Sequence, residues 1–245
     1  MFPAGRQAHK DRLMYQLVTS WQLSHYAIQP LSMYICVMPL LKEWNIGDHG
    51  RGAIWKVEED EAFFAEKTGI VSDIKNEKRR IEHLAGRYLL THLEEEFPLH
   101  TIQKDEHDKP RIPDDQFHFS ISHSWPYIAV AVDPVDAAGI DIQTWHPRID
   151  NIKHKFLSEG EQETMCHDPK YFTLAWCAKE AVYKWHGRRG IDFKEHLPIT
   201  YFSTSLDINI YMKLNKMPEM VFTKNFITTD FACSYVDHAQ PWAIY

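Results

Sequence analysis

The sequence predicts an α/β (α+β) protein, a pseudo-dimer of two similar subdomains that each pack a long helix on a small, mainly antiparallel sheet. Three observations support this fold class. Each half of the chain holds one long segment with apolar residues at helical spacing, each half holds several short strand-like runs, and a Trp-Pro turn joins two of those runs. We expect an N-terminal extension over 1–37, one subdomain over 38–133 and a second over 134–245.

The first long helix is expected between Ser72 and Phe97. Its apolar stripe consists of Ile81, Leu84, Ala85, Tyr88, Leu89 and Leu93. Ser72 is a candidate N-cap, and Pro98 would end the segment. The basic residues on this helix are Lys75, Lys78, Arg79, Arg80 and Arg87. Solvated charges on the helix surface are the simplest interpretation of that cluster.

A hairpin follows the first helix. Residues 117–122 alternate apolar and polar side chains, which is typical of a half-buried strand. Trp125-Pro126 would form the turn, and Tyr127 to Val132 the second strand. Another strand is expected over 139–143, and successive side chains on a strand point to opposite faces. Asp141 and Gln143 should therefore share the face opposite the two isoleucines.

The second long helix is expected from Pro169 to His186, with Gly187 placed to end it. Trp176, Glu180 and Lys184 form an i, i+4, i+8 row on a face outside the apolar stripe. Later strands are expected over Ile208 to Leu214, Phe231 to Val236 and Trp242 to Tyr245.

Composition restricts the function classes. The chain of 245 residues has a formal net charge of −7, which argues against a general nucleic-acid-binding surface. The cysteines, Cys36, Cys166, Cys177 and Cys233, form no CxxC pair, so we expect reduced thiols in the cytoplasm. The N-terminal stretch between Arg12 and Lys42 lacks charges, but repeated polar residues interrupt it. We therefore expect no membrane segment there.

Asp141, Gln143 and Glu180 are candidate ligands for Mg²⁺. Two carboxylates and an amide make the hard oxygen site that this ion prefers, together with waters and substrate phosphates. Lys184 lies one turn beyond Glu180 on the same helix face, where its ammonium could meet a phosphate. The alternative is an ordinary Glu-Lys helix pair of a few tenths of a kcal/mol, and spacing alone favours it.

Ser122-His123-Ser124 lies at the end of the first hairpin strand. This segment could hold a pyrophosphate. Ser122 and His123 are poorly placed as a nucleophile and its base, because neighbours on a strand point to opposite faces. The alternative is a turn capped by Ser124 beside a surface histidine. The histidines show no zinc-binding spacing, and we expect no zinc site.

Four motifs occur in series: Lys109-Pro110, Phe-Ser-Ile-Ser-His-Ser at 119–124, Gly-Ile-Asp-Ile at 139–142 and Trp-Cys-Ala-Lys-Glu-Ala-Val-Tyr-Lys at 176–184. In order and separation they resemble the 4′-phosphopantetheinyl transferases of the larger, surfactin-synthase-activating type. The resemblance covers roughly Met38 to Leu197. It implies a pseudo-dimeric fold with coenzyme A in the cleft between the subdomains.

The resemblance also implies roles for single residues. Lys109 would contact a coenzyme A phosphate, although Asp108 replaces the usual glycine before it. Ser122 and His123 would bind nucleotide phosphates, with His123 on the 3′-phosphate. Arg87 would lie near the adenosine end.

For the reacting end, the resemblance implies that Asp141 and Glu180 ligate Mg²⁺ and that Lys184 neutralises the pyrophosphate. Gln143 departs from the family pattern, in which many members have glutamate. An amide oxygen can still bind Mg²⁺ but supplies no charge. The metal site would then carry one negative charge fewer than a site with glutamate at this position.

The implied activity is of the holo-[acyl-carrier-protein] synthase type. It is the Mg²⁺-dependent transfer of 4′-phosphopantetheine from coenzyme A to a serine of an apo acyl or peptidyl carrier protein, giving the holo carrier and 3′,5′-ADP. Glu180 would deprotonate the serine directly or through water. A family member that binds coenzyme A or the carrier without transfer is the alternative. A Mg²⁺-dependent phosphodiesterase would use the same carboxylates but leaves the Ser-His-Ser segment unexplained.

The expected partners are coenzyme A and the carrier, with no nucleic acid and no membrane, and we expect a cytoplasmic monomer. The segment Pro147 to Gly190 carries eight Lys or Arg against six acids. Arg148, Lys153 and Lys155, beside an exposed-looking Phe156-Leu157 pair, are expected to meet an acidic carrier. The alternative is a solvated loop that Phe156 anchors in the core.

Overall fold

The computed structural model describes residues 39–106, 109–204, 208–214 and 219–241. The chain divides into two units, Met1–Val37 and Met38–Tyr245. The expected N-terminal extension with Cys36, the residue Asp108 and the expected strand Trp242 to Tyr245 fall outside the described residues. All that follows concerns the described part of the second unit.

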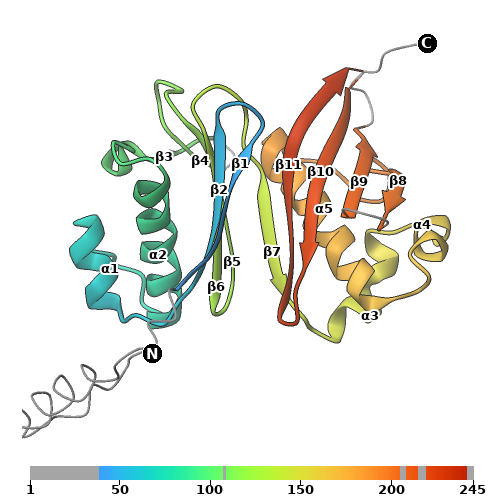
Figure 1. The fold of residues 1–245 in the computed structure, drawn as a ribbon, viewed down its shortest axis with the longest axis horizontal. Coiled ribbons are helices and arrows are strands. Elements are labelled where there is room, and N and C mark those ends of the chain that lie inside the picture. Colours follow the sequence, from blue (N-terminus) through green and yellow to red (C-terminus); the bar gives the residue numbers. More distant parts are fainter. Residues whose placement is uncertain (1–38, 107–108, 205–207, 215–218, 242–245) are drawn as a thin grey trace, which may run out of the picture. The chain divides into compact units, whose positions relative to one another are not determined.

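The first half contains a four-stranded antiparallel sheet in the order β1-β2-β6-β5. Its strands are β1 (Leu40–Ile46), β2 (Gly50–Lys56), β5 (His118–Ser124) and β6 (Tyr127–Asp133). Helices α1 (Glu61–Thr68) and α2 (Glu77–Leu93) lie on one side of this sheet (Figure 1). The apolar stripe predicted for α2 packs into the core between helix and sheet. The predicted hairpin is confirmed as β5 and β6, with Trp125-Pro126 at its turn.

Helix α2 is shorter than predicted. Its N-cap is Asn76, whose side chain accepts a hydrogen bond from the backbone N–H of Arg79. The Ser72 hydroxyl instead accepts from the N–H of Ile74, within a local turn before the helix. At the other end, the Arg51 guanidinium donates to the carbonyl of Leu93, which satisfies a terminal acceptor of the helix. Helix α1 was not predicted.

A short connection lies between α2 and β5. It contains the 3-10 helix η1 (Leu99–Thr101) and a two-stranded ribbon of β3 (Gln103–Lys104) and β4 (Pro110–Arg111).

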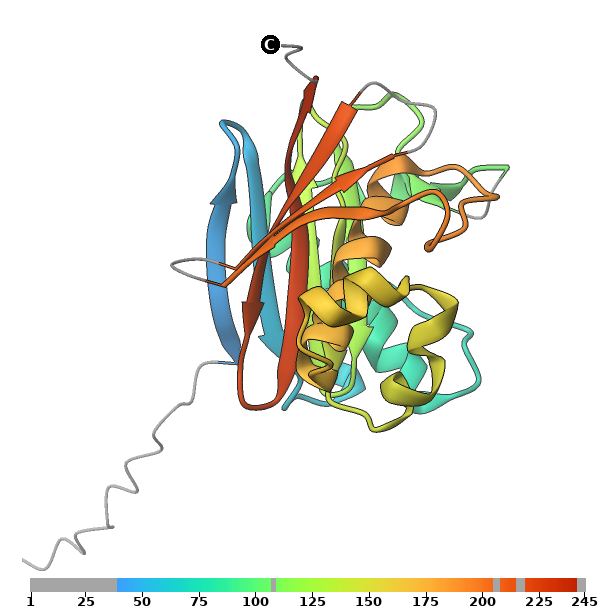
Figure 2. The same ribbon diagram turned by 90° about the vertical axis from the view of Figure 1, so that its right-hand side faces the viewer.

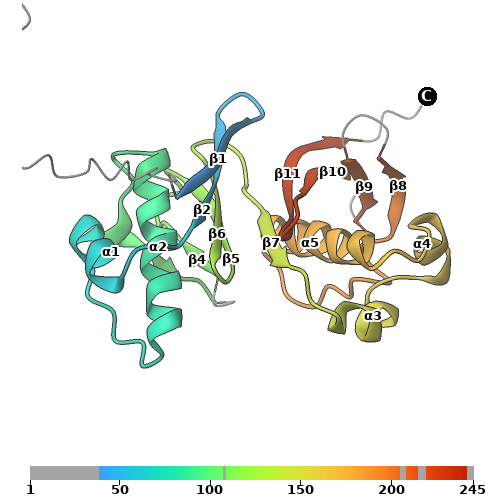
Figure 3. The ribbon, with the colours of Figure 1, turned by 60° about the horizontal axis from the view of Figure 1, so that its bottom comes forward.

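The second half contains a five-stranded antiparallel sheet in the order β7-β11-β10-β9-β8. Its strands are β7 (Ile140–Thr144), β8 (Ile199–Ser203), β9 (Ile208–Lys213), β10 (Glu219–Ile227) and β11 (Phe231–Pro241). Helix α5 (Pro169–His186) packs on one face of this sheet (Figure 3). The smaller helices α3 (Arg148–Ile152), η2 (Lys153–Lys155) and α4 (Glu159–Thr164) lie beside α5. The predicted fold class is confirmed, although β8 and β10 were not foreseen.

Helix α5 has the predicted bounds. Asp168 caps its first turn through a hydrogen bond from the N–H of Lys170, and Pro169 occupies the first helical position. Gly187 ends the helix with a φ of 72°, in the left-handed region that glycine adopts without strain.

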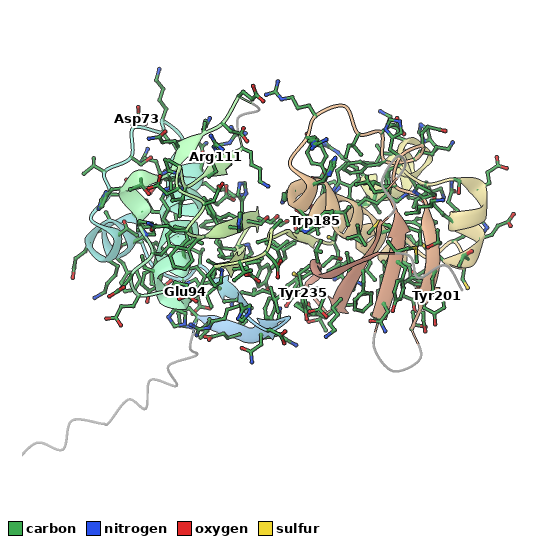
Figure 4. All side chains as sticks on the ribbon, turned by 90° about the horizontal axis from the view of Figure 1, so that it is seen from above. Asp73, Glu94, Arg111, Trp185, Tyr201 and Tyr235 are labelled. Atoms are coloured by element: carbon green, nitrogen blue, oxygen red, sulfur yellow. The ribbon has the colours of Figure 1, made fainter. Side chains whose placement is uncertain are left out.

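The two sheets meet across a third apolar cluster with buried residues from β1, β2, β6, β7 and β11. Figure 2 shows the molecule from the side of the second half, and Figure 4 shows the side chains from above, with Trp185 of α5 and Tyr235 of β11 near the junction. Gly139 permits the close approach of β7 to α5. A Cβ atom there would lie 2.2 Å from the carbonyl oxygen of Ala181. The proposed boundary between 133 and 134 remains a prediction.

The expectation of an exposed Phe156-Leu157 pair is wrong. Phe156 is 1% exposed and Leu157 0% exposed, and both pack in an apolar cluster with Phe172 of α5. The alternative, a loop that Phe156 anchors in the core, is the observed arrangement. Within the described part of the chain, no helix combines the length and the apolar character needed to cross a bilayer.

Candidate functional site

The candidate site forms where β5, the edge of the first sheet, lies beside β7, the edge of the second. Three serines of β5 accept hydrogen bonds from backbone N–H groups of β7. Ser120 accepts from Ile140 (3.2 Å), Ser122 from Ile142 (3.3 Å) and Ser124 from Thr144 (2.9 Å). The strands thus run in the same direction and side-chain hydroxyls join them. We call these three serines and their β7 partners the serine seam.

Asp141 is the central charged group beside this seam. It is 6% exposed. Its Oδ1 accepts a hydrogen bond from the Ser122 hydroxyl (2.6 Å) and forms an ion pair with Lys184 Nζ (2.6 Å). A buried carboxylate needs such partners, because burial without them strongly disfavours the charge. The prediction that Asp141 lies on the face opposite Ile140 and Ile142 is consistent with this, since both isoleucines belong to the inter-sheet cluster.

Lys184 points from α5 across to β7. Its Nζ also donates to the carbonyl of Ile140 (3.2 Å). The ammonium is therefore directed at the strand and not along the helix surface, where an ordinary i, i+4 pair with Glu180 would place it. The structure brings Ser122, Asp141 and Lys184 together, although neither the helix row nor the strand alternation predicted these contacts.

Glu180 lies one turn before Lys184. Its pKa is raised from 4.5 to about 7. Burial is the main cause, the negative charge of Asp141 adds to it, and the ammonium of Lys184 opposes it. The two carboxylates therefore interact in a half-buried place, and a divalent cation between them would relieve both burial and repulsion.

The donors near the serine seam that could face a cation are the oxygens of two carboxylates and one amide. Among the described residues, no group of three or more His, Cys, Asp or Glu side chains is placed to hold a metal. The Gln143 amide donates its N–H to the Ser124 hydroxyl (3.4 Å), which leaves its carbonyl oxygen as an acceptor. Two carboxylates, an amide oxygen and substrate phosphates are typical ligands of Mg²⁺.

Ser122 and His123 face in different directions, as strand geometry predicts. The His123 side chain is 54% exposed, and its Nδ1 lies 3.3 Å from Oε2 of Glu82 on α2. Ser122 is buried against Asp141. The two residues therefore do not form a nucleophile and base pair.

Lys109 caps the end of α5. Its Nζ donates to the carbonyl oxygen of Lys184 (2.6 Å), one of the terminal acceptors of that helix. Burial lowers the pKa of this lysine. Two adjoining cavities of about 250 and 230 Å³ share Lys109, Pro110, Phe119 and Gly187 in their walls. Lys184 and Arg189 line the first cavity, so this cleft is cationic on the side of α5.

Comparison with known proteins agrees with this geometry. The sequence profile of the 4′-phosphopantetheinyl transferase superfamily matches residues 137–236, which contain Asp141, Gln143, Glu180 and Lys184. Curated relatives include the 4′-phosphopantetheinyl transferase psf-1 of Bacillus pumilus, 32% identical over 123 residues, and a 4′-phosphopantetheinyl transferase of Bacillus subtilis, 32% identical over 129 residues.

Residues 137–236 are similar to the 4′-phosphopantetheinyl transferase superfamily, and both relatives carry that name. The match covers 45% and 49% of this chain, and 51% and 55% of the two relatives. The chain thus spans about half the length of the curated relatives it matches.

Arg87 is not among the residues that line the two adjoining cavities. It is half-buried on α2, and its Nη1 donates to the carbonyl of His83 on the same helix (3.2 Å). Burial lowers the pKa of Arg87, and it also lowers the pKa of His83 to about 4. Near the start of α2, the Lys78 ammonium lies 5.3 Å from the centre of the Trp125 ring. Arg80 is paired with Glu61 and is not a free surface charge.

A further cavity was not foreseen from the sequence. It has a volume of about 270 Å³, and its walls include Gln143 and Thr144 of β7, Thr173 and Trp176 of α5, and Arg148, Ile149 and Ile152 of α3. Along α5 it lies on the other side of Glu180 from the cationic cleft. Periodicity in the sequence could not predict this cavity, because the cavity depends on how the short helix α3 packs beside α5.

Proposed function

We propose that this protein transfers 4′-phosphopantetheine from coenzyme A to a serine hydroxyl of an apo acyl or peptidyl carrier protein, giving the holo carrier and 3′,5′-ADP. The observation that carries the proposal is the convergence of Asp141, Glu180 and Lys184 beside a cationic cleft. These residues belong to the segment that matches the transferase superfamily. We further propose that the protein acts as a cytoplasmic monomer without nucleic-acid or membrane partners.

The reaction needs one bond to form and one to break. The carrier serine oxygen attacks the β-phosphorus of coenzyme A, and the bond between that phosphorus and the bridging oxygen breaks, so that 3′,5′-ADP leaves with the oxygen. Glu180 accepts the proton of the serine hydroxyl. A pKa of about 7 suits a general base at neutral pH. Lys184 offsets the charge that develops on the departing diphosphate oxygen.

Asp141, Glu180 and the amide oxygen of Gln143 would hold Mg²⁺, which would bind the diphosphate oxygens and neutralise part of their charge when present. Within this set, Asp141 is fixed by Ser122 and Lys184. Gln143 contributes an oxygen without a charge, so the site carries two carboxylates.

The remaining family positions are proposed to bind coenzyme A. Lys109, Lys184 and Arg189 line the cleft and would attract its phosphates. His123 presents an exposed imidazole suited to the 3′-phosphate, and Arg87 on α2 is proposed to lie towards the adenosine end. The hydroxyl of Ser122, a family phosphate ligand by resemblance, is directed at Asp141.

The carrier is proposed to dock on Arg148, Lys153 and Lys155. Arg148 and Lys155 are exposed, whereas Lys153 pairs with Asp150 (2.7 Å) and lies 4.9 Å from the centre of the Phe172 ring. The cavity beside α3 opens between this basic surface and Gln143. An acidic carrier would therefore bring its serine to the side of Glu180 opposite the cationic cleft.

Mass spectrometry of the carrier tests the proposal. The full chain is incubated with coenzyme A, Mg²⁺ and a purified apo carrier from the same organism. A gain of one phosphopantetheine, absent when the carrier serine is replaced by alanine, is the expected result. The alternative, a protein that binds without transfer, is favoured by Gln143 and by Asp108. It predicts an unchanged carrier mass together with a calorimetric signal for coenzyme A binding, and that outcome would overturn the proposed transfer.

A further inference from the structure

Ser122 occupies the middle of the serine seam. Like Ser120, it is 5% exposed and accepts one backbone N–H from β7. The two hydroxyls therefore serve the junction of β5 and β7 in the same way. Each satisfies a backbone donor at the edge of a sheet, where no neighbouring strand supplies a carbonyl.

Ser122 differs from Ser120 in where its hydroxyl proton goes. A hydroxyl donates one hydrogen bond, and the Ser122 proton is directed to Oδ1 of Asp141 at 2.6 Å. The N–H of Ile142, which Ser122 accepts, belongs to the strand that carries Asp141. The hydroxyl is thus held by the backbone of β7 and in turn holds a side chain of β7.

Asp141 Oδ1 receives a second contact from Lys184 on α5. The carboxylate also interacts with the thiol of Cys177, whose pKa burial raises well above its usual value. Donors from β5 and α5 therefore converge on one buried carboxylate of β7. Ligating carboxylates at metal sites are commonly held in this way, and loss of such a partner weakens metal affinity roughly 10- to 100-fold.

We propose that Ser122 is a positioning residue that fixes the carboxylate of Asp141 for a divalent cation. The inference rests on the proposed function. The hydrogen bond from the Ser122 hydroxyl holds Oδ1 of Asp141 from the side of β5, so its loss should free the carboxylate to turn.

The test compares Ser122→Ala with Ser120→Ala. Each variant loses one hydroxyl and one hydrogen bond to a β7 N–H, but only Ser122→Ala loses the bond to Asp141. Crystal structures without metal or coenzyme A give the orientation of Asp141, and electron paramagnetic resonance gives Mn²⁺ affinity with coenzyme A present. We expect Ser122→Ala to reorient Asp141 and to bind Mn²⁺ roughly 10- to 100-fold more weakly. Ser120→Ala should retain both properties, and Ser122→Thr should restore them.

Two results would overturn the inference. One is an unchanged Asp141 orientation in Ser122→Ala, with the same Mn²⁺ affinity as Ser120→Ala. The other is a selective loss of coenzyme A affinity in Ser122→Ala, measured in EDTA, with Asp141 unmoved, which would assign Ser122 to phosphate binding. If the wild-type chain bound no Mn²⁺, the metal site of the proposed function would fail. The Asp141 orientation in the two variants would still decide the role of Ser122.

Discussion

Glu180 and Asp141 are both carboxylates of the candidate site, but their surroundings differ. Asp141 accepts from a hydroxyl and an ammonium. Glu180 has burial and a like charge acting on it, and its pKa rises to about 7. A group at this pKa can bind a cation or accept a proton near neutral pH. Without a metal, ionisation of Glu180 lowers the free energy of unfolding, because its charge is half-buried beside Asp141.

Glu180→Gln should stabilise the metal-free protein at high pH. Because the folded-state pKa of about 7 exceeds the ordinary value of 4.5, protonation favours the folded state, and stability is lost as the pH rises through 7. In EDTA at pH 8, Glu180→Gln should exceed wild type in unfolding free energy by at most about 3 kcal/mol, less after solvent screening. At pH 5 the gain should fall below about 1 kcal/mol.

Urea unfolding across this pH range measures the difference. Glu66→Gln, on the exposed side of α1, is the control for loss of one surface carboxylate. A gain for Glu180→Gln that is the same at pH 5 and pH 8 would contradict the raised pKa.

At the residue scale, the sequence predicted which side chains share a face but not what they touch. Alternation along 139–143 placed Asp141 and Gln143 together, and the i+8 row placed Glu180 beside Lys184. The partner of Lys184 and the proton of Ser122 could not be predicted, because both contacts join elements that are distant in the chain. The resemblance assigned Ser122 to phosphate, whereas the geometry directs it to Asp141.

At the scale of elements, long helices and hairpins were predictable and short elements were not. Helix α5 has an N-cap, a terminal glycine and an apolar stripe in its own sequence, so its bounds were predicted correctly. Strands β8 and β10 lack clear local signals and depend on pairing with β9.

The burial of Phe156 and Leu157 has a physical cause that no local pattern reveals. Lys179 on α5 is 0% exposed, and its Nζ contacts the carbonyl of Phe156 (2.7 Å) and Oε1 of Glu161 (2.8 Å). The same Glu161 oxygen accepts from the N–H of Ile199. Burial of an unpaired lysine charge is strongly unfavourable in free energy. The hydrogen bonds and ion pair of Lys179 therefore hold the loop before α4 against α5.

Gly139→Ala should separate β7 from α5. The added methyl would collide with the carbonyl oxygen of Ala181, which is backbone and cannot move aside like a flexible side chain. We expect a loss of about 1–3 kcal/mol in unfolding free energy and a longer distance between Lys184 Nζ and Asp141 Oδ1 in a crystal structure.

Gly160→Ala on α4 is the matched control, because a Cβ there meets nothing within 4 Å. It should leave stability unchanged or slightly raised, since alanine favours helices. Equal stabilities for the two alanine variants would refute the close-packing role of Gly139.

At the scale of the whole molecule, the helix and strand patterns of the two halves predicted the fold class, and the structure confirms it. The net charge is −7, yet the chain has two basic regions. One is the cleft lined by Lys109, Lys184 and Arg189, and the other is the surface beside α3. Both arise where separate elements meet. Total charge could therefore exclude a general polyanion-binding surface but could not locate either of these.

Charge reversal tests the carrier surface. Arg148→Glu and Lys155→Glu together should raise the carrier KM on the order of tenfold, because exposed charges steer an acidic partner. The KM for coenzyme A should not change. Added salt should raise the carrier KM of wild type, and it should reduce the difference in carrier KM between wild type and variant.

Lys67→Glu on α1, in the first half of the described unit, is the control for a change in surface charge. A carrier KM that rises equally in this control and in the α3 variant would indicate a general charge effect. An unchanged carrier KM in the α3 variant would remove the proposed docking surface.

The most direct test of the central claim is the mass of the apo carrier after incubation with coenzyme A, Mg²⁺ and either wild type, Lys184→Ala or Lys170→Ala. Lys170 lies in the first turn of the same helix and serves as the control. We predict that wild type and Lys170→Ala add one phosphopantetheine, that EDTA abolishes the addition, and that Lys184→Ala slows it by at least about 100-fold. Transfer at the wild-type rate by Lys184→Ala, or no transfer by the wild-type chain, would contradict the account.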